Sequence, residues 1–119
     1  MLFSKFGVDA EKLNYMVANT NSVGTAVAFT ESSATGTLGC SKMVNVDGVN
    51  KVVIKAFSGS FDAWRYVFVD SSDNVVAVST MTADEVVDGV AIMELEVPQG
   101  ATQFTFTYRQ GNSYGIYLV

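Results

Sequence analysis

Two glutamates, Glu94 and Glu96, have the spacing that comes nearest to a catalytic arrangement. They are two residues apart in the run VAIMELEVP, so they share one face of a strand. Glycoside hydrolysis needs two carboxyl groups, roughly 5 to 9.5 Å apart across a sugar-binding cleft. Charged residues on the polar side of an amphipathic strand normally face solvent, however. The pattern therefore favours surface acids, and a small glycan-cleaving enzyme is a minor alternative.

Histidine is absent from the sequence, and Cys40 is the only cysteine. Without imidazole the chain lacks the commonest general base, the usual partner of a serine or cysteine nucleophile, and any zinc site that contains histidine. A single thiol cannot form a thiolate metal site or an intrachain disulfide. Cys40 lies in the run SSATGTLGCS with no imidazole to activate it. We therefore expect an inert cysteine, no cofactor and no enzymatic activity.

A cluster of acids occurs in the connector MTADEVVDG, which holds Asp84, Glu85 and Asp88. Acidic loops can bind calcium, which takes about 6 to 8 oxygen ligands. The connector lacks the D-x-[DN]-x-[DN]-G spacing of a calcium loop. Solvated turn acids are therefore the favoured interpretation, and a calcium site at these three residues is the weak alternative.

Aromatic side chains are the remaining candidates for binding. Trp64, Tyr114 and Tyr117 could form a platform on which the C–H faces of a sugar stack. The competing interpretation is that strand aromatics belong to the core. The alternation of apolar residues already assigns Tyr66 and Tyr108 to the inside.

Composition limits the partners of the chain. At 119 residues it has the length of one domain, and 49% of its residues are apolar or aromatic. The net charge is −5 and the basic residues are scattered, so we expect no nucleic-acid partner. No apolar run approaches the roughly 20 residues that span a bilayer, so we expect no membrane insertion.

Period-two alternation predicts the secondary structure of the second half. In VAIMELEVP the alternation predicts an inward and an outward face, and QFTFTYR repeats it with Thr105 and Thr107 outside. AWRYVFVD and YGIYLV are apolar on both faces, which is typical of central strands or of an interaction surface. SSATGTLGCS is expected to be a surface loop and ADEVV a single helical turn. Together the patterns predict an all-β protein, a single antiparallel β-sandwich of about seven or eight strands.

The N-terminal segment has a different pattern. Asp9 could cap a short helix over residues 10–17, but the alternation of Leu13, Tyr15 and Val17 fits an extended strand equally well. We therefore expect residues 1–20 to be a short helix or arm for docking or oligomerisation, and residues 21–119 to be the sandwich domain. The apolar residues of the arm predicted to make assembly contacts are Leu2, Phe3 and Phe6.

The runs YVFVDSSDNVVAVST and MELEVPQGATQFTFTYR resemble the second half of a small jelly-roll sandwich. This sandwich occurs in phage head and tail appendages and in carbohydrate-binding modules. The shared pattern is an aromatic strand that ends in Asp, a polar turn, a return strand, and an apolar strand closed by Pro-x-Gly-Ala. The matching residues are Phe68, Asp70, residues 71–74, Pro98, Gly100 and Ala101.

The resemblance covers roughly residues 41–119 and implies a fold and a setting, and no catalytic residue can be carried over from it. It implies a structural protein of a virion, such as a head-fibre, capsid-decorating or tail-appendage subunit, that contacts other virion proteins. We expect a homo-oligomer, with a trimer favoured, and host-surface glycans as the candidate ligand. The alternative is a free carbohydrate-binding module in the extracellular space or at the cell surface.

Overall fold

The computed structural model describes residues 2–3 and 11–119. The described residues form short strands and no helix. In chain order the strands are β1 (Leu2–Phe3), β2 (Lys12–Leu13), β3 (Tyr15–Val17), β4 (Phe29–Glu31), β5 (Leu38–Cys40), β6 (Val44–Asn45), β7 (Lys51–Ala56), β8 (Arg65–Val69), β9 (Val75–Thr80), β10 (Glu85–Val87), β11 (Val90–Glu96), β12 (Gln103–Arg109) and β13 (Tyr114–Leu118).

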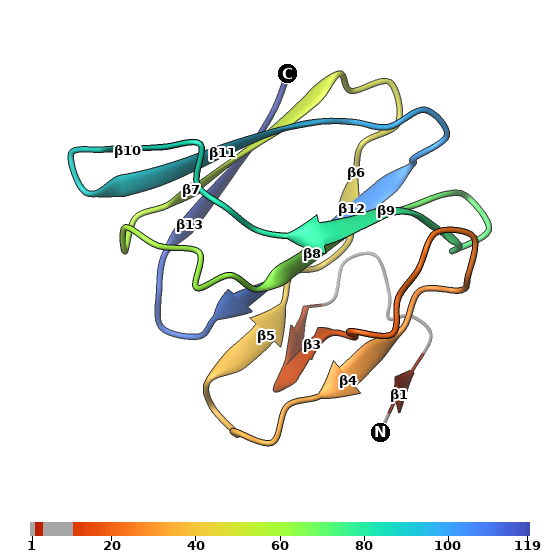
Figure 1. The fold of residues 1–119 in the computed structure, drawn as a ribbon, viewed down its shortest axis with the longest axis horizontal. Coiled ribbons are helices and arrows are strands. Elements are labelled where there is room, and N and C mark those ends of the chain that lie inside the picture. Colours follow the sequence, from red (N-terminus) through yellow and green to blue (C-terminus); the bar gives the residue numbers. More distant parts are fainter. Residues whose placement is uncertain (1, 4–10) are drawn as a thin grey trace.

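The strands form three sheets, which we call central, four-stranded and small (Figure 1). The central sheet has the order β2-β5-β12-β8-β9, and β6 also pairs with β12. The four-stranded sheet has the order β10-β11-β7-β13, and the small sheet has the order β1-β4-β3. All of these strand pairs are antiparallel. The antiparallel all-β sandwich predicted from the sequence is confirmed.

One face of the central sheet packs against the four-stranded sheet. Phe68 of β8 and Phe104 and Phe106 of β12 form this core with Ile54 of β7 and Met93 of β11. The alternation in β12 and β11 turns their large apolar residues to the same interior, as the sequence predicts. This core is the interior of the predicted sandwich.

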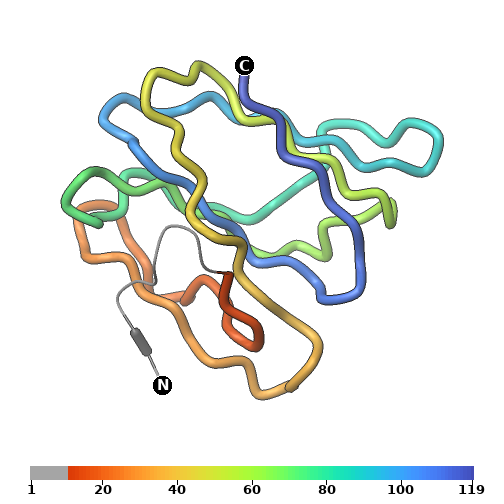
Figure 2. Tube along the Cα trace, turned by 180° about the vertical axis from the view of Figure 1, so that it is seen from behind, coloured from red at the N-terminus to blue at the C-terminus, as the bar shows by residue number. Residues whose placement is uncertain are grey.

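The opposite face of the central sheet packs against the small sheet. Val67 and Val69 of β8 form a second core with Val17 of β3 and Phe29 of β4. Figure 2 shows β3 and β4 on one side of the molecule and the four-stranded sheet on the other. The prediction that β8 is a central strand covered on both faces is confirmed.

This third layer overturns the predicted exposure of two threonines. Thr105 and Thr107 alternate with the core phenylalanines and were expected outside, yet they are 0% and 2% exposed. The Thr105 hydroxyl donates to the Ser41 carbonyl at 2.8 Å, and Thr107 Oγ1 accepts from the Val17 N–H at 2.9 Å. Their burial is tolerated because each hydroxyl has a partner.

Three local predictions are wrong. The second half of SSATGTLGCS is not a surface loop, because β5 is fully buried between β2 and β12. ADEVV does not form a helical turn, because residues 85–87 are β10, which pairs with β11 around the two positive-φ residues Asp88 and Gly89. The helix proposed over residues 10–17 is replaced from residue 12 onward by β2 and β3.

The described part of the N-terminal segment belongs to the sheets. Asn14 has a φ of 67° and separates β2, which pairs with β5, from β3, which pairs with β4. Residues 2 and 3 also pair with β4. The extended alternative of the sequence analysis therefore describes residues 12–17 better than the helix does.

The chain moves between sheets in the second half instead of forming one meander. Asp47 and Gly48 form the predicted turn, but β6 before it pairs with β12 and β7 after it pairs with β11 and β13. Likewise β12 pairs with β8 instead of with β11.

Among the described residues there is no helix with the length and apolar character needed to traverse a bilayer.

Candidate functional site

A groove of about 450 Å³ is lined by residues of β12 in the central sheet and β13 in the four-stranded sheet. Phe106 and Tyr108 of β12 line it from the central sheet. Tyr114 and Ile116 of β13 form the wall from the four-stranded sheet. Ser41 and Lys42, in the connector between β5 and β6, also line the groove, and the remaining lining residues are Glu11, Val44 and Asn112. This volume is within the usual range for a small-molecule site, roughly 300 to 1,000 Å³.

Three aromatic rings contact one another in this groove. The ring centroids of Phe106 and Tyr108 are 6.2 Å apart, and Tyr114 lies 5.8 Å from Phe106 and 5.9 Å from Tyr108. Tyr114 meets both rings edge to face, the arrangement that aromatic quadrupoles favour. The alternation of β12 places Phe106 and Tyr108 on the same side of the strand. Tyr108 and Tyr114 are half-buried and face the groove, and the buried Phe106 ring supports them from the core. We call these three rings the aromatic cluster.

Gly39 makes room for the Tyr108 ring. The two residues are directly paired across β5 and β12. A Cβ atom at Gly39 would lie 2.9 Å from both Cζ and Oη of Tyr108. Sequence reasoning missed Gly39, although glycine inside a strand often marks such a close approach.

The Tyr108 hydroxyl is directed to the carboxylate of Glu11. Oη donates to Glu11 Oε2 at 2.5 Å, a bond that links β12 to the residue before β2. Burial raises the pKa of the Tyr108 phenol above its ordinary value, and the neighbouring Glu11 carboxylate raises it further. The phenol is therefore a neutral donor at physiological pH, and it fixes one carboxylate oxygen at the groove.

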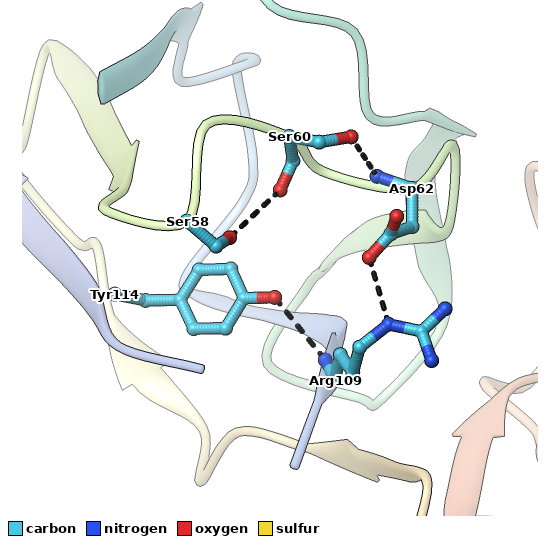
Figure 3. A network of polar contacts seen from close by, with 5 residues as sticks. All are labelled: Ser58, Ser60, Asp62, Arg109 and Tyr114. Atoms are coloured by element: carbon cyan, nitrogen blue, oxygen red, sulfur yellow. Dashed lines mark hydrogen bonds and ion pairs between the residues drawn. The ribbon is translucent and has the colours of Figure 1, made fainter. Parts of the chain in front are cut away.

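Polar contacts hold Tyr114 in place (Figure 3). Its Oη accepts a hydrogen bond from the Arg109 N–H at 3.2 Å, and Arg109 Nε forms an ion pair with Asp62 Oδ2 at 3.0 Å. Asp62 is fixed in turn by its N–H, which donates to Ser60 Oγ at 3.0 Å, and Ser58 Oγ donates to the Ser60 carbonyl at 3.4 Å. This network connects the groove to the loop that follows β7.

Two polar side chains of the groove, Lys42 and Asn112, are available to bind a ligand. Within the described part of the chain, the ammonium group of Lys42 and the side-chain amide of Asn112 have no hydrogen-bond or ion-pair partner. Lys42 is exposed and Asn112 is half-buried. Both can bind an incoming polar ligand without first breaking an internal contact.

The three predicted sugar-stacking residues do not share a surface. Tyr114 lines the groove, but Tyr117 is an odd number of residues away and points to the outer face of the four-stranded sheet. There its ring lies over Gly115, and Lys55 Nζ is 5.2 Å from the ring centroid. Trp64 precedes β8, does not line the groove, and has a buried indole N–H without a partner among the described residues. Tyr108, assigned to the core, is instead a groove residue.

The acids considered for calcium are distributed along the β10–β11 hairpin. Asp84 Oδ2 accepts from the Glu94 N–H at 2.7 Å, Glu85 is exposed in β10, and Asp88 is in the turn. Within residues 2–3 and 11–119, no three Asp, Glu or Cys side chains come together as a group that could hold a metal ion. The structure thus does not unite these three residues in one site.

Glu94 and Glu96 lie on the outer face of the four-stranded sheet. Glu94 Oε1 forms a 2.6 Å ion pair with Lys51 Nζ, and neither glutamate lines the groove.

Cys40 is fully buried, and this burial raises the pKa of its thiol to about 12, although a hydrogen bond with Thr107 opposes the shift. A thiol in this environment is a poor nucleophile.

The predicted assembly residues can be placed in part. Leu2 and Phe3 pair with Thr30 and Phe29 of β4 in the same chain. Phe6 lies outside the described residues.

A second and smaller groove, about 270 Å³, is lined by Asn45, Asp47, Ser71, Thr102 and Gln103 and has no aromatic lining.

Comparisons with known proteins give no relatives. No family model matches the chain, and neither the curated proteins nor the solved structures contain a significant match.

Proposed function

We propose that this protein is a non-enzymatic binding subunit that holds a short oligosaccharide in the groove on β12. The observation that carries the proposal is the aromatic cluster of Phe106, Tyr108 and Tyr114, whose rings are in mutual contact and line a groove with polar groups beside them. Sugar rings present C–H faces that bury well on aromatic side chains and hydroxyl groups that need hydrogen-bond partners. The groove offers both kinds of contact.

The polar groups around the cluster match the chemistry of sugar hydroxyls. Lys42 and Asn112 offer uncommitted donors, and Asn112 also offers an acceptor. Glu11 holds the Tyr108 hydroxyl with Oε2 and retains Oε1 as an acceptor. The groove can therefore exchange hydrogen bonds in both directions with a ligand that is itself both donor and acceptor.

As the biological setting we propose a virion, in which the chain is a head-fibre, capsid-decorating or tail-appendage subunit that contacts host-surface glycans. The support for this setting is the resemblance of YVFVDSSDNVVAVST and MELEVPQGATQFTFTYR to jelly-roll appendage proteins. Mass spectrometry of purified particles tests it, because a structural subunit is present there in fixed stoichiometry. If particles lack the chain, a free carbohydrate-binding module becomes the better description.

A glycan array followed by titration tests the binding function. We expect the wild-type chain to retain a defined set of oligosaccharides, and Lys42→Ala and Asn112→Ala each to weaken the affinity roughly two- to tenfold, the value of one hydrogen bond. Tyr108→Leu should weaken it further because it removes a stacking ring.

Lys55→Ala is the matched control, since Lys55 is a lysine on the outer face of the four-stranded sheet, away from the groove. It should bind like the wild type. The proposal fails if the wild type binds no glycan, or if Lys55→Ala weakens binding as much as Lys42→Ala does.

A further inference from the structure

Strand β13 forms one edge of the four-stranded sheet. Within residues 2–3 and 11–119, it pairs with β7 alone. Its hydrogen bonds to β7 involve odd-numbered positions, as the bonds from the Phe57 N–H to the Ser113 carbonyl and from the Val119 N–H to the Lys51 carbonyl show. Antiparallel ladders alternate, so the backbone groups of Tyr114, Ile116 and Leu118 point away from the sheet.

This edge has none of the features that prevent strand addition. Edge strands are normally protected by charge, proline, a bulge or short length. The run YGIYL contains no charge and no proline, spans five residues, and pairs with β7 without a register shift. It is also apolar at the surface, since Tyr117 and Leu118 are 47% and 46% exposed.

The other sheet edges are protected to a greater degree. Strand β9 pairs with β8 through a register shift, and Val75 at its start exchanges hydrogen bonds with the backbone of Gly24 and Thr25. Strand β10 has three residues and begins with Glu85, and β2 has two residues and includes Lys12. Strand β13 is therefore the edge best suited to pair with another strand.

We propose that β13 pairs antiparallel with β13 of a second copy of this chain, about a two-fold axis at Ile116. In this register Ile116 faces its own counterpart, and Tyr114 faces Leu118. All of these positions have their backbone groups directed outward, so each facing pair can exchange both N–H···O bonds. The two four-stranded sheets then form one continuous sheet.

Side chains favour the same register. Gly115 faces Tyr117 of the second copy on the outer face, and glycine at a strand edge is commonly covered by a cross-strand aromatic ring. The Tyr117 ring already covers Gly115 within its own chain, with its Oη and Cε2 at 2.8 and 2.9 Å from a Cβ at Gly115. Leu118, half exposed in the single chain, gains an apolar neighbour in Tyr114. No like charges face each other across this junction, because the strand has none.

An edge-to-edge pair of this kind is closed and two-fold, so it gives a dimer and no larger ring. This differs from the trimer expected from the resemblance. It is also independent of the carbohydrate proposal, although Tyr114 and Ile116 belong to both surfaces and the added strand would border the groove.

Light scattering and backbone amide exchange on the full chain test the pairing. We expect the mass of two 12.8 kDa chains, and protection of the Ile116 amide that is lost on dilution to the monomer. Leu118→Pro removes an outward N–H that β7 does not use, so it should give a folded monomer.

Val86→Pro is the matched control on the opposite edge of the same sheet. Its N–H also points away from the sheet, because Val87 and Val90 flank the two-residue turn and take the hydrogen-bonded position. This variant should remain a dimer. A monomeric or trimeric wild type, or a dimer that Val86→Pro disrupts and Leu118→Pro does not, would overturn the proposal.

Discussion

Thr107 and Val17 join the central sheet to the small sheet through one buried hydrogen bond. Thr107 Oγ1 accepts from the Val17 N–H at 2.9 Å, across 90 residues of sequence. Beside it, Cys40 Sγ donates to the Tyr15 carbonyl at 3.4 Å. The backbone of β3 that faces away from β4 is thus satisfied by side chains of β12 and β5 in place of another strand.

Replacing Thr107 by Val should destabilise the fold by about 1–3 kcal/mol, because the buried Val17 N–H loses its acceptor and cannot reach water. Urea unfolding measures the change. Thr107→Ser keeps the hydroxyl and should cost less, and Thr80→Val at an exposed position of β9 is the control, with little effect. Equal stability of Thr107→Val and the wild type would show that this bond does not join the layers.

The Cys40 thiol should make the fold sensitive to alkaline pH. In the folded chain the pKa of Cys40 is raised from 9.0 to about 12. The unfolded thiol therefore loses its proton first, and the free energy of unfolding falls as the pH rises between these values, by on the order of a few kcal/mol. The check is urea unfolding at increasing pH in the wild type and in Cys40→Ala, which should lose less stability over this range. Identical slopes for the two proteins would contradict the burial of an un-ionised thiol.

Gly39→Ala should displace the Tyr108 ring. The new Cβ would lie 2.9 Å from ring atoms, and such overpacking costs about 1–3 kcal/mol of stability. The same substitution in a Tyr108→Leu background should cost less, because the two ring atoms at 2.9 Å are gone and only the Lys12 carbonyl oxygen, at 3.3 Å, remains close. If Gly39→Ala costs the same in both backgrounds, the strain lies elsewhere in β5.

Glu11→Gln should lower the pKa of Tyr108. Burial is the larger cause of the raised value and remains, so the phenol should ionise below its wild-type pH but still above the ordinary tyrosine pKa of about 10. Tyrosinate absorbance during alkaline titration measures this, with Tyr108→Phe identifying the signal. In the wild type, stability should fall as pH rises above about 10, because the unfolded phenol ionises first. An unchanged Tyr108 titration in Glu11→Gln would mean that the two side chains do not interact in solution.

The strands of the second half could be predicted from sequence because their alternation reflects a buried and an open face. Met93 and Phe104 follow this rule, and both are in the core. Thr105 and Thr107 do not, because a third layer formed by N-terminal strands far away in the sequence covers the open face. A local pattern contains no information about such a distant layer.

The groove could be predicted even less well. Tyr108 alternates like a core residue, and its place in a groove beside Tyr114 depends on how β12 and β13 of two different sheets meet. Tyr114 and Tyr117 are close in sequence, but an odd spacing directs them to opposite faces of the sheet. Glycine at position 39 was the one local sign of the close approach, and β5 itself resembled a loop because its residues are small.

If oligosaccharides bind on the aromatic cluster, NMR titration with one that the chain retains should locate the ligand there. We predict that shifts concentrate at Tyr108, Tyr114 and the side-chain amide of Asn112, and that Tyr117 and Val86 on other surfaces do not respond. Shifts that concentrate at Tyr117 on the outer face, or no shift with any oligosaccharide, would contradict binding on the aromatic cluster.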